Sequence, residues 1–214
     1  MNRVKLSQIR DSVLKQRKHL SFEEVRQRSE QMIQHFLEVA KTLPVRLPPQ
    51  LHVACYDALA DEVCLESLGP VVKSLQWKVY FPRVIKRGDQ KGLEFVEMDS
   101  IDLKNAKIQV GSFGIREPHP YLQPVDPKQL NLIWVPGVAF GPQGERVGRG
   151  AGYYDRFLPL APQALRVSLA FDFQLFSSLP QQPWDVPVHW VITEKREFKT
   201  EFVDHWSRQG GNPS

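Results

Sequence analysis

Residues 132 to 158 constrain the fold of this chain more than any other stretch. They read LIWVPGVAFGPQGERVGRGAGYYDRFL: an apolar run, a loop with five glycines, and a helix start at Tyr153. The apolar run is typical of a strand buried on both faces, and glycines let successive backbone N–H groups turn toward one anion. Arg146 and Arg149 add full positive charges. The stretch therefore predicts a phosphate-binding loop between a buried strand and a helix.

Other segments surround this loop with alternating strands and helices. A first amphipathic helix precedes a second one that begins at a Ser21–Glu24 capping box and is expected to bury Phe22. Residues 57–61 are expected to form the turn that begins a helix carrying Glu62. Short apolar runs predict further strands at 51–56, 78–81 (ended by Pro82), 93–96 (an edge hairpin), 166–171 and 188–193. The alternation predicts an α/β fold, with a mostly parallel sheet and helices on both faces.

A length of 214 residues fits one domain. We expect a single α/β catalytic domain over residues 1–193, followed by a polar C-terminal tail over 194–214. Residues 98–130 contain several prolines and are expected to form a long ordered loop over the site.

Net charge, cysteine usage and hydrophobicity limit the classes of partner that we expect for this chain. Lys and Arg number 28 against 24 Asp and Glu, with a pI near 9.1, which favours anionic partners. The two cysteines, Cys55 and Cys64, form no Cys-x-x-Cys or Cys/His cluster, which argues against a zinc site. No apolar window approaches the length of a membrane span, and no signal peptide is evident. We therefore expect a cytoplasmic protein with no membrane partner.

The glycine loop matches neither the Walker nor the dinucleotide fingerprint. Asp155 helps to define its chemistry, because a carboxylate about 4 Å from a phosphate charge would lose roughly 4 kcal/mol at an effective dielectric constant near 20. A divalent cation between the two groups removes this repulsion, and Mg²⁺ held by one or two carboxylates plus phosphate oxygens is the usual arrangement. The alternative is an ordinary aspartate at a helix start, paired with Arg156.

The stretch from Val135 to Leu158 resembles the signature of the 5-formyltetrahydrofolate cyclo-ligase family (also called methenyltetrahydrofolate synthetase). The shared motifs are PG-x-A-F, G-x-R-x-G-x-G-x-G, YYD and a following Leu. Weaker similarities run along nearly the whole chain, among them Asp61-Glu62-Val63, Glu117-Pro118 and Val191-Ile192-Thr193.

The resemblance implies an α/β fold similar to the ribose-5-phosphate isomerase and CoA-transferase class. It also implies a reaction in which ATP phosphorylates the formyl oxygen of 5-formyltetrahydrofolate. N10 then attacks the activated carbon, and ADP and phosphate are released as 5,10-methenyltetrahydrofolate forms. The implied cofactors are ATP and Mg²⁺. The implied partner is a reduced folate, with or without a polyglutamate tail, and we expect a monomer or weak dimer and no nucleic acid.

The resemblance also implies site residues. Asp155 and Asp185 would hold Mg²⁺, and Asp57, Glu62 and Tyr154 would contact the folate. Arg149 and Tyr154 would act in catalysis. The ATP-binding residues would be Lys5, Arg10, Arg146, Gly148, Arg149, Gly150, Ala151, Gly152 and Tyr153.

Two positions depart from the family pattern. Many relatives carry a lysine between the last two loop glycines, where this chain has Ala151, and Arg149 is the obvious substitute charge. The family usually has a lysine four residues before Arg10; here that residue is Leu6, and Lys5 lies about 100° further around the helix.

Two other function classes remain open on the sequence. One is a diverged relative that binds ATP or another anion without cyclising folate, in a regulatory or interaction role. The other is a nucleic-acid module, suggested by the basic first helix and by Trp184 and Trp190, although no RNA- or DNA-binding motif supports it.

Overall fold

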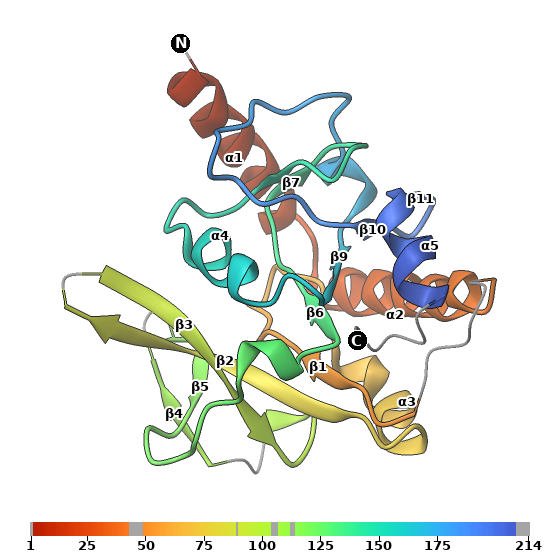
Figure 1. Ribbon diagram of the computed structural model, residues 1–214. Helices are drawn as coiled ribbons and strands as arrows, with labels where there is room; N and C mark the ends of the chain where they lie inside the picture. Colours follow the sequence, from red (N-terminus) through yellow and green to blue (C-terminus); the bar gives the residue numbers. More distant parts are fainter. Residues whose placement is uncertain (1, 43–48, 89, 104–106, 112–113, 209–214) are drawn as a thin grey trace.

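A computed structural model describes residues 2–42, 49–88, 90–103, 107–111 and 114–208. Its centre is a seven-stranded sheet in the order β11-β10-β9-β6-β1-β2-β3 (Figure 1). The strands of this sheet are β1 (His52–Ala54), β2 (Lys78–Arg87), β3 (Gln90–Met98), β6 (Leu132–Trp134), β9 (Leu165–Leu169), β10 (Trp190–Ile192) and β11 (Glu197–Lys199).

The inner part of the sheet is parallel, as predicted. β1 pairs in parallel with β2 and β6, and β9 pairs in parallel with β6 and β10. The two outermost strands, β3 and β11, are antiparallel to their neighbours. The expected edge hairpin is present as β2–β3, and the strands predicted near 51–56, 166–171 and 188–193 are confirmed as β1, β9 and β10.

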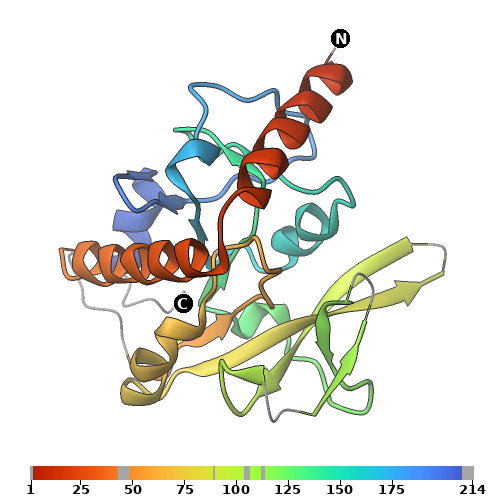
Figure 2. The same cartoon turned by 180° about the vertical axis from the view of Figure 1, so that it is seen from behind.

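Both faces of the sheet are buried, because alternate residues of each inner strand enter different clusters. Val53, Trp134 and Trp190 belong to one cluster, whereas Ile133 and Val191 belong to the other. The first cluster includes residues of α2 (Phe22–Ala40), η1 (Glu66–Leu68), α3 (Gly69–Ser74) and α5 (Glu201–Arg208). The second includes residues of α4 (Tyr153–Phe157) and η5 (Leu158–Leu160). Figures 1 and 2 show the long helix α2 running across one side of the sheet.

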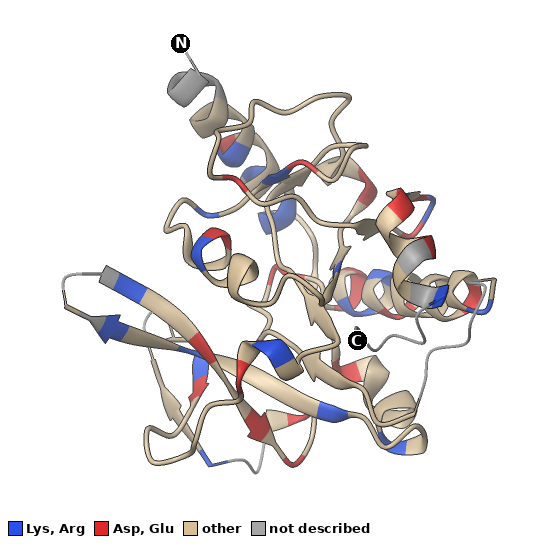
Figure 3. Cartoon of the chain, in the orientation of Figure 1, with Lys and Arg blue, Asp and Glu red and all other residues tan. Residues whose placement is uncertain are grey.

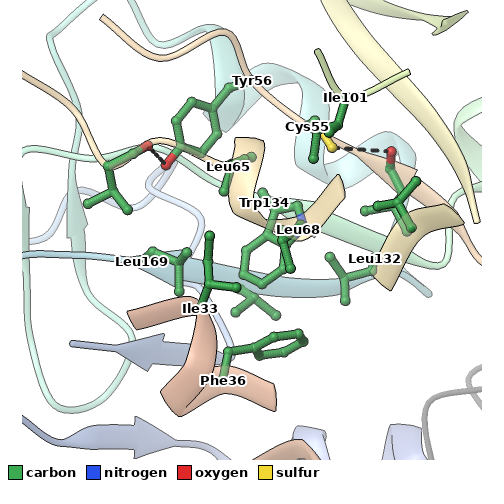
Figure 4. Packing of buried hydrophobic residues seen from close by; sticks show 14 of the residues in the cluster. Ile33, Phe36, Cys55, Tyr56, Leu65, Leu68, Ile101, Leu132, Trp134 and Leu169 are labelled. Carbon is green, nitrogen blue, oxygen red and sulfur yellow. Dashed lines mark hydrogen bonds between the residues drawn. The ribbon is translucent and has the colours of Figure 1, made fainter. Parts of the chain in front are cut away.

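Large side chains hold α2 against the sheet. The ring of Phe36 meets Trp134 edge-on, with 4.8 Å between centroids, and lies 5.7 Å from Trp190. Figure 4 shows Phe36 and Ile33 beneath Trp134 and Leu132, with Leu65 and Leu68 packed beside them. This packing joins α2, the inner strands and the segment after β1 into one core.

Helix α2 begins as predicted, at a capping box in which the Ser21 side chain accepts from the Glu24 N–H and the Glu24 carboxylate accepts from the Ser21 N–H. The expectation that Phe22 is buried is wrong: its side chain is 76% exposed. Phe22 falls on the same helical face as the buried Val25, Ile33 and Phe36, but it is the first residue of the helix, where no core residue covers that face.

Pro82 does not end its strand, contrary to expectation. β2 runs through Pro82, which lies opposite Phe95 of β3. β1 pairs only with residues 78 to 80 of β2, so the β1-side edge is open from Phe81 onward. The Val84 N–H, two residues further along the strand, is bonded to Glu117 on that side rather than to β3. A missing N–H at Pro82 therefore costs no ladder hydrogen bond.

The segment expected to be a polar tail is structured from residue 197 to residue 208. β11 pairs with β10 at the edge of the sheet, and α5 buries Val203 and Trp206 in the core. Residues 209–214 lie outside the described part of the chain. The expected boundary at 193 therefore cuts through a folded unit, because apolar residues two or three apart in a short polar helix carry a weak periodic signal.

Residues 98–130 contain secondary structure of their own. The described parts form a small hairpin of β4 (Ile108–Val110) and β5 (Arg116–Pro118), and η4 (Pro127–Gln129). Arg83 of β2 donates to the carbonyl oxygens of His119 and Leu122, which holds this region to the sheet. Residues 104–106 and 112–113 are not described.

Charged residues of both signs are distributed along the surface elements, including α2 and the β2–β3 hairpin (Figure 3). On α2, for example, Arg26 pairs with Glu23 and Glu30. Among the described residues, no helix combines the length and the apolar character needed to cross a membrane.

His189 makes the stability of the fold depend on pH. Its ring stacks on Phe202 with 3.8 Å between centroids, and its Nδ1 accepts from the Arg166 N–H. Burial, aided by the charge of Arg166, lowers the His189 pKa from 6.5 to about 3. Below pH 6.5 His189 is protonated in the unfolded chain but stays neutral in the folded chain. The free energy of unfolding therefore decreases as pH falls from 6.5 toward 3, by up to about 1.4 kcal/mol per pH unit.

Urea unfolding at pH 7, 6 and 5 measures this effect. His189→Gln should flatten the decline in unfolding free energy between pH 6 and 5, whereas His19→Gln, at an exposed position, should leave the slope unchanged. Equal slopes in wild type and His189→Gln would contradict the assignment.

Candidate functional site

The glycine loop lies beyond the carboxyl end of β6, where ligands of parallel sheets usually bind. Its first part folds into a two-stranded ladder of β7 (Ala139–Phe140) and β8 (Arg146–Val147). Its second part turns through Gly150 and Gly152, with φ values of +104° and +64°, and Gly152 caps α4. Residues with a side chain rarely adopt these backbone angles, so glycine is required at both positions.

The turn leaves backbone donors available. Within the described chain, the N–H groups of residues 149 to 152 donate no hydrogen bond to the protein. Gly150 and Ala151 are exposed. α4 has only five residues, so the helix adds little to the field here and the free N–H groups are the main backbone contribution.

Helix α1 (Asn2–Lys18) supports the loop from outside. Leu6 and Ile9 pack against Ala139 and Val147 of the β7–β8 ladder, and the Arg10 Nε donates to the Gly148 carbonyl oxygen at 2.8 Å. Arg10 therefore lies at the loop, and its contact with the nucleotide stays a prediction. The side chain of Lys5 lies outside the described residues.

Arg149 connects the loop to the segment that follows β1. Its guanidinium donates to Oε1 of Glu62 at 2.8 and 3.1 Å and lies 3.5 Å from Asp61. The Arg149 side chain is 45% exposed and that of Glu62 is 13% exposed. Two residues 87 positions apart, one predicted for ATP and one for folate, are thus in direct contact.

Glu62 does not begin a helix, contrary to expectation. The chain from Asp57 to Leu65 is irregular, and helical structure starts only with η1 at Glu66. Both Glu62 oxygens are engaged: Oε2 accepts from the Leu59 N–H, and Oε1 accepts from Arg149 and also pairs with Arg17 at 3.2 Å. Contacts with distant arginines, and with its own loop, orient this carboxylate.

Arg17 also contacts the segment that follows β1, although it is not among the predicted site residues. It lies in the last turn of α1 among the exposed Lys15 and Lys18, yet it is only 1% exposed. Its Nε donates to the Asp61 carbonyl oxygen at 2.6 Å. Its position four residues after the apolar Val13 is a signal for the buried face of α1, whereas a partner 44 positions away leaves no trace in the sequence.

Arg146 differs from its expected role as a phosphate contact. Its side chain is 4% exposed and donates to Asp155 Oδ1 at 2.6 Å, so the guanidinium lies beneath the loop. Asp155 therefore pairs with Arg146 and not with the adjacent Arg156. Arg156 instead donates to the carbonyl oxygens of Lys91 and Ala151, and lies over the ring of Tyr153, 5.5 Å from its centroid.

The residue that follows Asp185 contacts Asp155. The Val186 N–H donates to Asp155 Oδ1 at 3.3 Å, and Asp185 Oδ2 accepts from the Gln182 N–H. Among the described residues, neither Asp155 Oδ2 nor Asp185 Oδ1 accepts a hydrogen bond, and no cluster of three or more His, Cys, Asp or Glu is arranged to hold a metal. Two carboxylates without further protein ligands fit Mg²⁺, which takes its remaining ligands from water and phosphate.

Tyr154 is oriented inward. Its ring lies against Arg146, with the guanidinium carbon 5.9 Å from the centroid, and its hydroxyl is buried without a hydrogen-bond partner in the described structure. Burial raises the Tyr154 pKa far above its ordinary value. The hydroxyl is therefore protonated at neutral pH, so it can donate a hydrogen bond but cannot act as a base.

Asp57 is more tightly engaged than a substrate contact requires. It accepts from the backbone N–H of Arg116 at 2.9 Å and from the Arg116 side chain at 2.6 to 3.2 Å. Both carboxylate oxygens are used, so Asp57 anchors β5 at the end of β1, and its folate contact stays a prediction.

The geometry can be compared with known proteins. The model of the 5-formyltetrahydrofolate cyclo-ligase family matches residues 2–194. The chain belongs to this family. The match covers every described residue of the site, from the α1 arginines to Asp185, and it confirms the resemblance based on the glycine loop.

Individual members of the family are similar to this chain in sequence and in fold. The 5-formyltetrahydrofolate cyclo-ligase of Haemophilus influenzae is 29% identical over 195 residues, which cover 90% of this chain and 99% of that protein. The NMR structure of Aquifex aeolicus 5,10-methenyltetrahydrofolate synthetase superimposes with a TM-score of 0.70 at 34% identity, over 91% of this chain and 92% of that one. A Mycoplasma pneumoniae 5,10-methenyltetrahydrofolate synthetase, 22% identical, shares the fold with a TM-score of 0.68 over 89% and 99% of the two chains.

Proposed function

We propose that this chain catalyses the ATP- and Mg²⁺-dependent cyclisation of 5-formyltetrahydrofolate to 5,10-methenyltetrahydrofolate, with release of ADP and phosphate. Family membership supports the reaction class. The observation that carries the proposal for this particular site is the 2.8 Å contact between Arg149 and Glu62, because it makes a phosphate loop and a carboxylate suited to a pterin immediate neighbours.

The nucleotide would be held by the glycine loop. Its free N–H groups from residue 149 to residue 152 and the exposed guanidinium of Arg149 can all turn toward one phosphate chain. Arg10 lies behind Gly148 and fixes the loop from α1. Arg156 supplies a cation beside Ala151, where many relatives have a lysine.

The reduced folate would be recognised by Glu62. A pterin presents paired N–H donors, and a carboxylate accepts such a pair with both oxygens. The charge of Glu62 acts on the buried Tyr154 hydroxyl. Because this hydroxyl has no hydrogen-bond partner in the described structure, it is a second polar group that could bond to the substrate.

Mg²⁺ would be held by Asp155 and Asp185 and would supply charge neutralisation to the transferring phosphoryl group. Arg146 then has a positioning role: it stays beneath the loop and holds Asp155 Oδ1, which leaves Oδ2 directed elsewhere. In this arrangement the aspartate is oriented before any ligand arrives, which lowers the cost of ordering it.

The chemistry requires positioning more than a protein nucleophile. The formyl oxygen attacks the γ-phosphorus, ADP leaves, and the formyl carbon becomes electrophilic. N10 attacks this carbon and loses its proton to water or to the departing phosphate, and the C–O bond to the phosphate breaks as the C–N double bond of the new ring forms. Arginine and backbone donors stabilise the charge that develops on the transferred group, as in other phosphoryl transfers.

The test is direct. The purified protein with Mg-ATP and 5-formyltetrahydrofolate is expected to form a product with the ultraviolet absorption of the methenyl compound, and phosphate should be released in equal amount. Omission of ATP or chelation of Mg²⁺ should abolish both signals.

Other outcomes identify the alternatives. Saturable ATP binding without product would indicate a relative that has lost cyclisation. Oligonucleotide binding that weakens with salt, in a protein that neither binds ATP nor converts 5-formyltetrahydrofolate, would indicate a nucleic-acid module.

A further inference from the structure

We propose that Arg17 is a positioning residue for the folate, acting through Glu62. The inference rests on the proposed function, because it takes Glu62 to be the folate contact. Arg17 lies in α1 and belongs neither to the glycine loop nor to residues 55–65, the β1–η1 segment. Its role therefore depends entirely on contacts made in the folded chain.

The first argument is burial. A guanidinium that is 1% exposed has lost its hydration and must be compensated by other groups. All of its observed partners belong to one short segment: the Asp61 carbonyl oxygen at 2.6 Å, Asp61 Oδ1 at 3.0 Å and Glu62 Oε1 at 3.2 Å. Arg17 therefore holds both the backbone and the carboxylates of that segment.

The second argument is charge balance. Two arginines, Arg17 and Arg149, face the carboxylates of Asp61 and Glu62. Arg149 is 45% exposed and can turn to a phosphate, whereas Arg17 is enclosed and cannot leave. When Arg149 engages the nucleotide, Arg17 is the cation that remains paired with Glu62 and holds it in place.

The third argument is the geometry of α1. Arg10, Val13 and Arg17 are three and seven residues apart and so share one face of the helix. Val13 on that face is fully buried, Arg10 contacts Gly148 of the glycine loop, and Arg17 contacts the β1–η1 segment. One rigid helix thus fixes the relative position of the proposed nucleotide and folate sites.

Direct binding of 5-formyltetrahydrofolate without ATP tests the inference. Calorimetric titration of wild type should show saturable binding. Arg17→Lys keeps the positive charge but replaces the planar guanidinium, with its several N–H groups, by a single ammonium group. The Kd for folate should increase about tenfold, the loss expected for one charge-assisted hydrogen bond. ATP binding should change less than threefold, and Lys18→Gln, the exposed neighbour, should alter neither ligand.

A double variant separates positioning from general damage. If Arg17 acts through Glu62, Arg17→Lys should weaken folate binding little further in a Glu62→Gln background. Additive losses, an equal loss of ATP affinity, or a folded Arg17→Lys with the wild-type folate Kd would each overturn the inference. Melting temperatures establish that the variants are folded, and Arg17→Gln provides a second substitution if the lysine form is not. A wild type that does not bind 5-formyltetrahydrofolate would overturn the proposed function, and this inference with it.

Discussion

Asp155→Asn is expected to lower the free energy of unfolding by about 3 kcal/mol as well as to abolish cyclisation, because it leaves a buried arginine charge without its counter-ion. Arg146 is 4% exposed and Asp155 is its ion-pair partner at 2.6 Å. A loss of activity in this variant would therefore not by itself identify a Mg²⁺ ligand. Chemical denaturation of the variant measures the first effect, and the product assay measures the second.

A double variant separates the two roles of Asp155. Arg146→Met combined with Asp155→Asn removes both charges, so most of the stability should return while turnover stays absent. Glu23→Gln breaks a fully exposed pair with Arg26 and should leave the free energy of unfolding nearly unchanged. If Asp155→Asn is as stable as wild type, the buried pair contributes nothing. If the double variant recovers turnover, Asp155 is not needed for the metal.

Arg149→Met is expected to lower kcat by about 10²–10³-fold, the usual loss when one donor to the transition-state charge is removed. Stability should change little, because Arg149 is 45% exposed and exposed pairs contribute about 0–1 kcal/mol. Initial rates at saturating substrates and a thermal melt measure both quantities.

Arg26→Met is the matched control for Arg149→Met. Arg26 is an exposed arginine that also pairs with two carboxylates, Glu23 and Glu30, but it lies on α2. Its replacement should leave kcat unchanged. An Arg149→Met enzyme with wild-type kcat would exclude this arginine from the transition state and leave the backbone N–H groups and Arg156 as the donors.

The features that the sequence predicted well depend on short-range patterns. The capping box joins residues three positions apart, and the apolar runs that became β1, β9 and β10 are continuous in the chain. The glycine loop was recognised because its spacing is itself the signature. Such signals need no knowledge of what lies across the fold.

The incorrect expectations share a different physical origin. Pro82 is tolerated in mid-strand because β1 has already ended beside it, and the supposed tail is ordered because β10 offers it an edge and the core accepts Trp206. In each case a neighbour distant in sequence decides the outcome. Local propensity is a weak predictor wherever tertiary contacts of this kind compete with it.

By itself, the sequence determined the α/β class and the family to which the chain belongs, and it predicted a phosphate-binding loop at residues 141 to 153. Only the tertiary structure decided which charges are paired: Arg146 with Asp155, Asp57 with Arg116, and Glu62 with both Arg17 and Arg149. Pairs 9 to 87 residues apart leave no periodic trace in the chain. Where such a pair is buried, as for Arg146 and Asp155, the loss of one partner is costly, because a charge removed from water depends on the few groups that the fold places beside it.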